Sequence, residues 1–240
     1  MNHLAVAALL CFVALPVLAA GDYDKSAKTD AYDIRLRVPV AALAVAPLKA
    51  EIFKRWKKDS GDLTKMAVDD KKSLPQYFHP YALDTQWRVT FESADVLSVS
   101  GYSYIDEGGA HPNAAFDSIV WDKQVSRAVP LDDLFAKGQT RAAIAAIAAS
   151  ARATFIAWAN KQQGEEPIDP AMADEGIGKD SAHLGHYALT HDAGVAKANG
   201  IVLLYGAGED WAHVMGDVKL AVPVGVFRKY LTPRWAAEFR

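Results

Sequence analysis

The segment VLSVSGYSYIDEGGAHPN, residues 96–113, gives the strongest indication of the fold. Its first nine residues are mostly apolar, aromatic or small, which is typical of a β-strand, and a double glycine then marks a turn. Working outward, residues 87–92 alternate apolar and polar side chains, and residues 116–121, mostly β-branched or aromatic, form a third candidate strand. We therefore predict an antiparallel meander of three strands.

The apolar positions of the central strand change parity along its length. Leu97 and Val99 are odd-numbered, whereas Tyr102 and Tyr104 are even-numbered. An extra residue in one strand reverses the facing of everything beyond it, so we predict a β-bulge at Gly101.

Further elements follow from periodicity and from proline. A helix is expected to begin at Pro47, and the most regular helical pattern covers residues 139–163. Further strands are expected at residues 34–38, 187–190, 201–205 and 218–222, and a short last helix at residues 223–230. The predicted fold class is α+β: an antiparallel meander with packed helices, as two small sub-domains or one fused unit.

Residues 1–20 contain no Lys, Arg, Asp or Glu and include an apolar run. This is typical of a signal peptide cut after Ala19 or Ala20, and a periplasmic or secreted location follows. The alternative is an uncleaved anchor. Residues 21–30 are small, charged and aperiodic, and we interpret them as a flexible tether. No transmembrane segment is expected in the mature chain.

The net charge of −3 disfavours a nucleic-acid partner, because such proteins are usually basic. The single cysteine, Cys11, lies in the predicted signal peptide, so the mature chain can form no internal disulfide. Stability must therefore come from a hydrophobic core.

The loop after the central strand is the main candidate site. Its glycines permit a sharp turn, and Pro112 restricts His111 to an extended conformation. The predicted ligand-binding residues of this region are Tyr104, Asp106, Glu107, Gly108, Gly109, His111 and Asn113. The loop is either a polar binding site, or half of a catalytic one, or a structure that His111 merely holds closed.

Two other clusters contain residues that could carry chemistry. His183, His186 and His191 invite a zinc interpretation, but the first two would point to opposite faces of an extended segment. We expect no metal and no cofactor. Trp211 follows a glycine-rich stretch, where it either stacks on a ligand or fills the core; it is included among the ligand-binding candidates. A paired-carboxylate glycosidase leaves no sequential signal and stays open.

The chain resembles a recognised pair of bacterial domains. Residues 32–129 resemble the PdaC-type domain, above all in Gly108-Gly109-Ala110-His111-Pro112-Asn113. Residues 131–235 resemble the RsiV-type C-terminal domain, in Leu131-Asp132-Asp133-Leu134-Phe135 and in Val222-Pro223-Val224. We accordingly divide the chain into residues 31–130 and residues 131–240.

The resemblance implies an extracytoplasmic α+β recognition module without catalytic activity, which binds lysozyme or a peptidoglycan-related ligand. Two alternatives stay open. One is an envelope hydrolase that uses His111 with Glu107 or Asp106 as general acid and base. The other is a structural accessory of an envelope complex.

Overall fold

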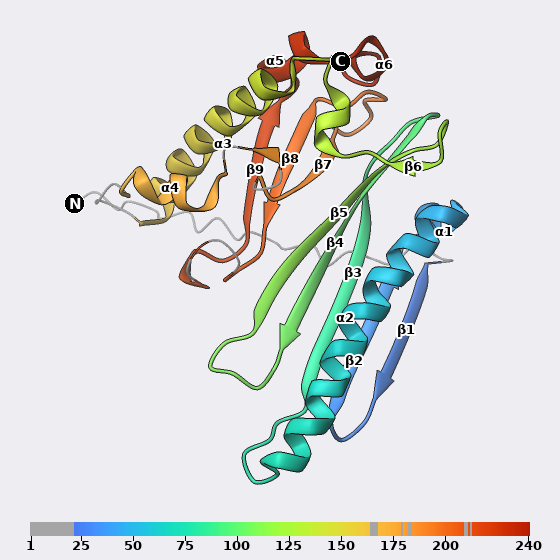
Figure 1. The fold of residues 1–240 in the computed structure, drawn as a ribbon, viewed down its shortest axis with the longest axis vertical. Coiled ribbons are helices and arrows are strands. Elements are labelled where there is room, and N and C mark those ends of the chain that lie inside the picture. Colours follow the sequence, from blue (N-terminus) through green and yellow to red (C-terminus); the bar gives the residue numbers. More distant parts are fainter. Residues whose placement is uncertain (1–21, 164–167, 179, 182–183, 209–210, 212) are drawn as a thin grey trace, which may run out of the picture.

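The computed structural model describes residues 22–163, 168–178, 180–181, 184–208, 211 and 213–240. The predicted signal peptide lies outside these residues. The first half of the chain forms a six-stranded sheet in the order β1-β2-β3-β4-β5-β6, in which only β2 and β3 are parallel (Figure 1). Its strands are β1 Tyr23–Lys28, β2 Tyr32–Val38, β3 Tyr81–Glu92, β4 Val96–Asp106, β5 Asn113–Asp122 and β6 Arg127–Ala128. The predicted meander corresponds to β3, β4 and β5, and the α+β class is confirmed.

The flexible tether predicted for residues 21–30 is wrong where the structure describes it. Tyr23–Lys28 forms the edge strand β1, which pairs along its whole length with β2. The Arg35 guanidinium donates a 2.9 Å hydrogen bond to Asp24 across this pair. Charged side chains are usual on edge strands because they oppose aggregation, and they leave no apolar alternation to detect.

One face of the first sheet is covered by helix α2, Ala46–Ser73, which α1, Val40–Leu43, precedes (Figure 1). Pro47 lies in the first turn of α2, as predicted, because its missing N–H needs no partner there. The helix continues to Ser73. Its buried stripe consists of Leu48, Ile52, Ser60, Leu63 and Ala67.

The bulge predicted at Gly101 is also wrong. Gly101 pairs in regular register with Trp87 on β3 and with Asp117 on β5, and the irregularity lies in β3 between Val89 and Phe91. The parity change has another cause. Both faces of β4 are covered: Leu97 and Val99 pack in the cluster below α2, whereas Tyr102 packs in a cluster with residues of the second sheet.

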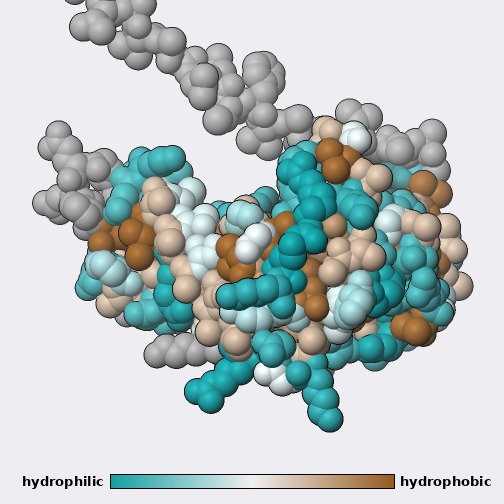
Figure 2. All heavy atoms as spheres, turned by 90° about the horizontal axis from the view of Figure 1, so that it is seen from above, coloured by the Kyte–Doolittle hydropathy of each residue, from teal (hydrophilic) through white to brown (hydrophobic). Residues whose placement is uncertain are grey.

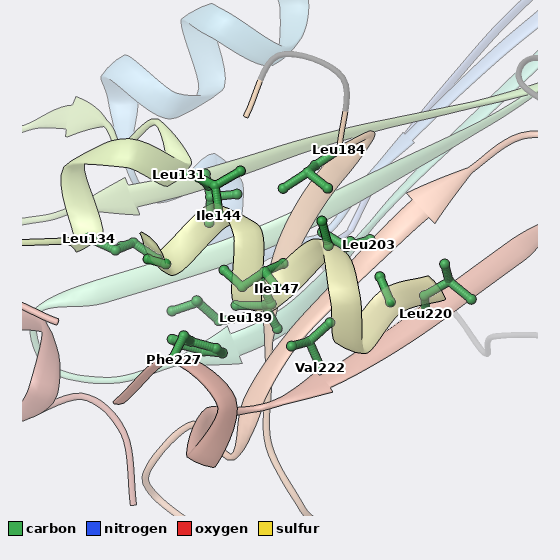
Figure 3. Close-up of a cluster of buried hydrophobic side chains, with 14 of the residues drawn as sticks. Leu131, Leu134, Ile144, Ile147, Leu184, Leu189, Leu203, Leu220, Val222 and Phe227 are labelled. Atoms are coloured by element: carbon green, nitrogen blue, oxygen red, sulfur yellow. The ribbon is translucent and has the colours of Figure 1, made fainter. Parts of the chain in front are cut away.

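The second half of the chain forms a three-stranded antiparallel sheet, β7-β8-β9, against the long helix α3. The chain runs through η1 Leu131–Leu134, α3 Thr140–Gln163, α4 Ala171–Gly176, β7 His186–Thr190, β8 Gly200–Tyr205, η3 His213–Met215, β9 Val218–Pro223, α5 Val224–Phe227, η4 Arg228–Tyr230 and α6 Pro233–Ala236. Figure 3 shows Ile144 of α3 beside Leu131 and Ile147 beside Leu189, in the same buried cluster as Leu203, Leu220 and Val222 of the sheet.

Helix α3 bears on the expectation that the mature chain has no transmembrane segment. Over Thr140–Gln162 it is long and apolar enough to cross a membrane by length and composition, with a mean hydropathy of 1.5. The core helix of a globular protein can meet the same criteria, so the expectation stays a prediction. Ile147, Ala151 and Phe155 of this helix are fully buried within the protein, as is usual for the core helix of a globular domain.

The two halves share the main hydrophobic cluster, and the first half has further buried clusters of its own. Phe91, Val96 and Val120 of the first sheet belong to the same buried cluster as α3 and the second sheet. The boundary at residue 130 stays a prediction, although the two sheets lie on either side of it. The face seen in Figure 2 mixes hydrophilic residues with several hydrophobic patches.

Candidate functional site

The predicted loop forms the tip of the hairpin between β4 and β5 (Figure 1). Asp106, the last residue of β4, accepts a 2.9 Å hydrogen bond from the backbone N–H of Gly108. Gly108 has a φ of +71°, and a Cβ there would lie 3.3 Å from the Tyr81 ring. The first glycine is therefore required by the turn and by close packing. Gly109 is not among the positive-φ glycines.

The far side of the loop contacts the segment between β8 and β9. The His111 ring faces His213, with ring centroids 5.9 Å apart, and the backbone N–H of Ala114 donates to the Ala207 carbonyl at 3.4 Å. These contacts join the hairpin to the segment between β8 and β9. Among the described residues, no hydrogen bond or ion pair joins His111 to Asp106 or Glu107.

Tyr104 and Asn113 lie where the two strands of the hairpin join its loop. Tyr104 pairs with Asp84 on one side and with Ala114 on the other, and 38% of its surface is exposed. Asn113 is exposed and lies opposite Ile105 in the ladder. Both residues are accessible, but they do not line the hollow described below.

Trp211 does not belong to the exposed site. It is 7% exposed and stacks on Phe155, with ring centroids 4.4 Å apart. Its indole N–H donates a 2.9 Å hydrogen bond to the Met172 carbonyl. The prediction of Trp211 as a ligand-stacking residue is corrected: it fills the core around α3 and α4.

The histidine cluster is only partly described, because His183 lies outside the described residues. His186 Nδ1 lies 3.7 Å from Asp117, and His191 packs on the edge of Phe91. In the part of the chain that the structure describes, no group of three His, Cys, Asp or Glu side chains is arranged to hold a metal ion.

The structure adds a feature beside the hairpin tip, which we call the aromatic–acidic hollow. It has a volume of about 240 Å³ and lies between the hairpin tip and the segment that follows α2. It is lined by Asp70, Leu74, Tyr77, Phe78, His79, Tyr81, Glu107 and Gly108. The sequence feature that could have indicated this hollow is the run Tyr77-Phe78-His79-Pro80-Tyr81, in which aromatic residues surround a proline.

Charge and hydrogen bonding organise this hollow. The Tyr81 hydroxyl donates a 2.6 Å hydrogen bond to the Asp70 carboxylate. This bond, together with burial and the nearby charge of Glu107, raises the pKa of Tyr81 to about 12. Tyr77 is 75% exposed at the rim. The hollow thus offers exposed aromatic surface beside two carboxylates, a combination suited to polar ligands with an apolar face.

A second hollow of about 380 Å³ lies on the other side of Glu107. It is lined by Asp59, Asp62, Leu63, Met66, Leu83, Ser103, Ile105, Glu107 and Ala115. Glu107 therefore takes part in two adjoining depressions between the hairpin and α2. Among the predicted ligand-binding residues, Glu107 is the one that lines both hollows.

Comparison with known proteins supports part of the predicted resemblance. Residues 25–114 match the family model described as "Deacetylase PdaC". No curated protein sequence matches the chain. A crystal structure of a DUF3298 family protein from Pseudomonas aeruginosa is similar, with a TM-score of 0.58 and 14% sequence identity over 92% of this chain and 97% of that one.

A DUF3298 family protein from Bacteroides fragilis is also similar, with a TM-score of 0.52 and 17% identity over 90% of this chain and 94% of that one. At these identities the likeness concerns the fold alone. The PdaC-like part of the prediction is supported, while the RsiV-type likeness of the second half stays a prediction.

Proposed function

We propose that this chain is an extracytoplasmic recognition domain that binds a peptidoglycan-derived glycan in the aromatic–acidic hollow. The observation that carries the proposal is the exposed Tyr77 ring beside the carboxylates of Asp70 and Glu107. Sugar rings present an apolar face that packs on aromatic side chains, and their hydroxyl groups donate hydrogen bonds to carboxylates. The match of residues 25–114 to a family named for a deacetylase agrees with an envelope setting.

Binding of a lysozyme is the second candidate. The hairpin tip is exposed from Glu107 to Asn113 and carries Glu107 next to Asp106. Such a protruding acidic loop is suited to a basic protein, because complementary charge accelerates encounter and selects partners. The hydrolase alternative has less support, since His111 faces His213.

A calorimetric titration separates these candidates. The probes are a soluble disaccharide-peptide from peptidoglycan and a c-type lysozyme, added to the chain that begins after the predicted signal peptide. We expect saturable binding of the glycan, and roughly tenfold weaker binding by the Tyr77→Ala and Glu107→Gln proteins. Asp132→Asn, an exposed carboxylate in η1, is the matched control and should bind as the parent does.

Tyr104→Ala distinguishes the two surfaces. Loss of lysozyme binding in this variant and in Glu107→Gln, with no glycan binding by any protein, would favour the hairpin tip as a protein-binding loop. Absence of heat with both probes, from protein shown to be folded by circular dichroism, would refute the proposal.

The proposed cellular location can be tested by identifying the amino terminus of the mature protein. Export with cleavage after Ala19 or Ala20 predicts a periplasmic or secreted protein that begins at Ala20 or Gly21, measurable by intact mass. β1 begins at Tyr23, so either cut leaves the edge strand complete. A full-length mass in the soluble cytoplasmic fraction would contradict the proposed location.

A further inference from the structure

A larger cavity, of about 590 Å³, lies between the two sheets. Its size is within the range of small-molecule sites in proteins. Residues of both sheets and of the C-terminal segment line it: Arg88, Thr90, Ser100, Phe116, Thr190, Asn199, Gly200, Ile201, Val202, Leu204, Lys219, Ala221, Val222, Pro223 and Arg240. We call it the intersheet cavity.

The cavity arises from the way the two sheets meet. β7 packs against β3, β4 and β5, and the buried N–H of Leu189 donates a 3.0 Å hydrogen bond to Ser98 across this contact. β9 instead packs against α3. The sheets are therefore close at β7 and separate toward β9, and Phe116, Ala188 and Leu204 form a small buried cluster between them.

Two cations face this cavity from opposite sheets. Arg88 comes from β3 and Lys219 from β9, and neither forms an ion pair within the described part of the chain. The Lys219 ammonium lies over the Phe116 ring, 5.2 Å from its centroid. Burial and the positive charge of Arg88 lower the pKa of Lys219, while Asp217 acts in the opposite direction. The two cations thus lie near enough to affect each other.

The remaining wall separates into a polar and an apolar part. Ser100 is 4% exposed, and its hydroxyl makes no hydrogen bond within the described residues. Because Ser100 pairs with Arg88 in the ladder, the two side chains share one face of the sheet. On the facing sheet, Val202 and Ala221 are paired and present an apolar surface. Arg240 also lines the cavity, but it is paired with Asp192.

We propose that the intersheet cavity binds an amphipathic monoanion, with its carboxylate between Arg88 and Lys219 and its apolar body against β8 and β9. Two like charges that form no ion pair among the described residues repel each other, and a carboxylate placed between them would pair with both. The Ser100 hydroxyl is available as a further donor. The apolar wall excludes a small hydrophilic anion as the preferred occupant. This site lies apart from the aromatic–acidic hollow and does not depend on the proposed function.

The test uses decanoate as the probe, with decanol as the uncharged match and acetate as the head group alone. Isothermal titration of the purified chain should give saturable binding of decanoate, at least tenfold tighter than decanol and far tighter than acetate. Lys219→Met should weaken decanoate binding roughly tenfold and leave decanol binding unchanged. Lys137→Met, at an exposed lysine outside the cavity, is the matched control and should bind as the parent does.

A second variant tests the apolar part. Ala221→Phe should fill the cavity and abolish decanoate binding, while circular dichroism shows an unchanged fold, because Ala221 lies on the exposed side of β9. Equal binding of decanoate and decanol, equal losses in Lys219→Met and Lys137→Met, or no saturable binding by the folded parent protein would overturn the proposal.

Discussion

Tyr81 links the hairpin tip to the core at the scale of a single residue. Its ring lies below Gly108, where any larger residue would meet it, and its hydroxyl donates to Asp70 at the end of α2. One side chain therefore holds the turn, the helix end and the first residue of β3 together. The position of Glu107 depends on this arrangement.

The titration of Tyr81 provides the first prediction. Its folded-state pKa of about 12 lies above the usual value near 10, so its contribution to stability is complete below pH 10 and is lost as the pH rises through 12. Absorbance at 295 nm, compared between the parent and Tyr81→Phe, should show one phenol that ionises near pH 12. Asp70→Asn should return it toward pH 10.

The same residue makes a stability prediction. Tyr81→Phe removes a hydrogen bond to a charged group, which should lower the free energy of unfolding by about 1.5 kcal/mol at pH 7. Urea unfolding measures it. The difference between the two proteins should shrink above pH 12, and an unchanged difference there would contradict the role given to the Asp70 bond.

Single residues also mark the limit of the sequence analysis. The stretch around Trp211 was compatible both with an exposed ligand-binding aromatic and with a core residue, because burial there depends on Phe155, which comes from α3 far earlier in the chain. Likewise Asp70 and Glu107 are brought together by the packing of a helix end on a hairpin. No local pattern contains that information, whereas the turn at Gly108 was predictable from its residues alone.

At the scale of elements, β4 shows why the bulge prediction failed. Alternation predicts one buried face, and a change of parity then indicates an irregularity. Here both faces of β4 are buried, one below α2 and one against the second sheet. Position 101 requires a glycine because the Trp87 indole lies across it. A Cβ at this position would lie 2.8 Å from the nearest ring atom.

Two glycines provide a matched prediction. Gly101→Ala should destabilise the protein by about 1–3 kcal/mol, because the rigid Trp87 ring must shift in a packed core. Gly61→Ala, in the interior of α2 with nothing within 4 Å, should stabilise it by up to about 1 kcal/mol. Thermal unfolding of both variants gives the comparison. A stabilising Gly101→Ala would show that Trp87 is not fixed in place.

At the scale of the whole molecule, the shared core joins halves that the sequence separates. Strand and helix periodicities predicted most elements of each half, since those patterns are local. They do not reveal that Phe91 and Val120 pack with α3, because the residues that these side chains contact lie far away in the sequence. The intersheet cavity was unpredictable for the same reason.

The contact between the sheets makes the last prediction. Ser98→Ala should cost about 1–3 kcal/mol, because the buried Leu189 N–H loses its acceptor. Unfolding followed by tryptophan fluorescence and by circular dichroism should stay a single transition in the parent protein. Ser26→Ala on the exposed edge strand β1 is the control and should change stability little. Two separated transitions in the parent would contradict a shared core.

The C-terminal segment bears on the timing of folding. Ser93, in the turn between β3 and β4, donates a 2.8 Å hydrogen bond to Glu238, which lies 145 residues later, and Arg234 reaches Asp122. A hairpin forms within about 1–10 μs, whereas a ribosome needs roughly 7–29 s to add those residues at about 5–20 residues per second. The bonds that tie the C-terminal segment to the first sheet can therefore form only when synthesis of the chain is nearly complete, long after the hairpin itself has had time to form.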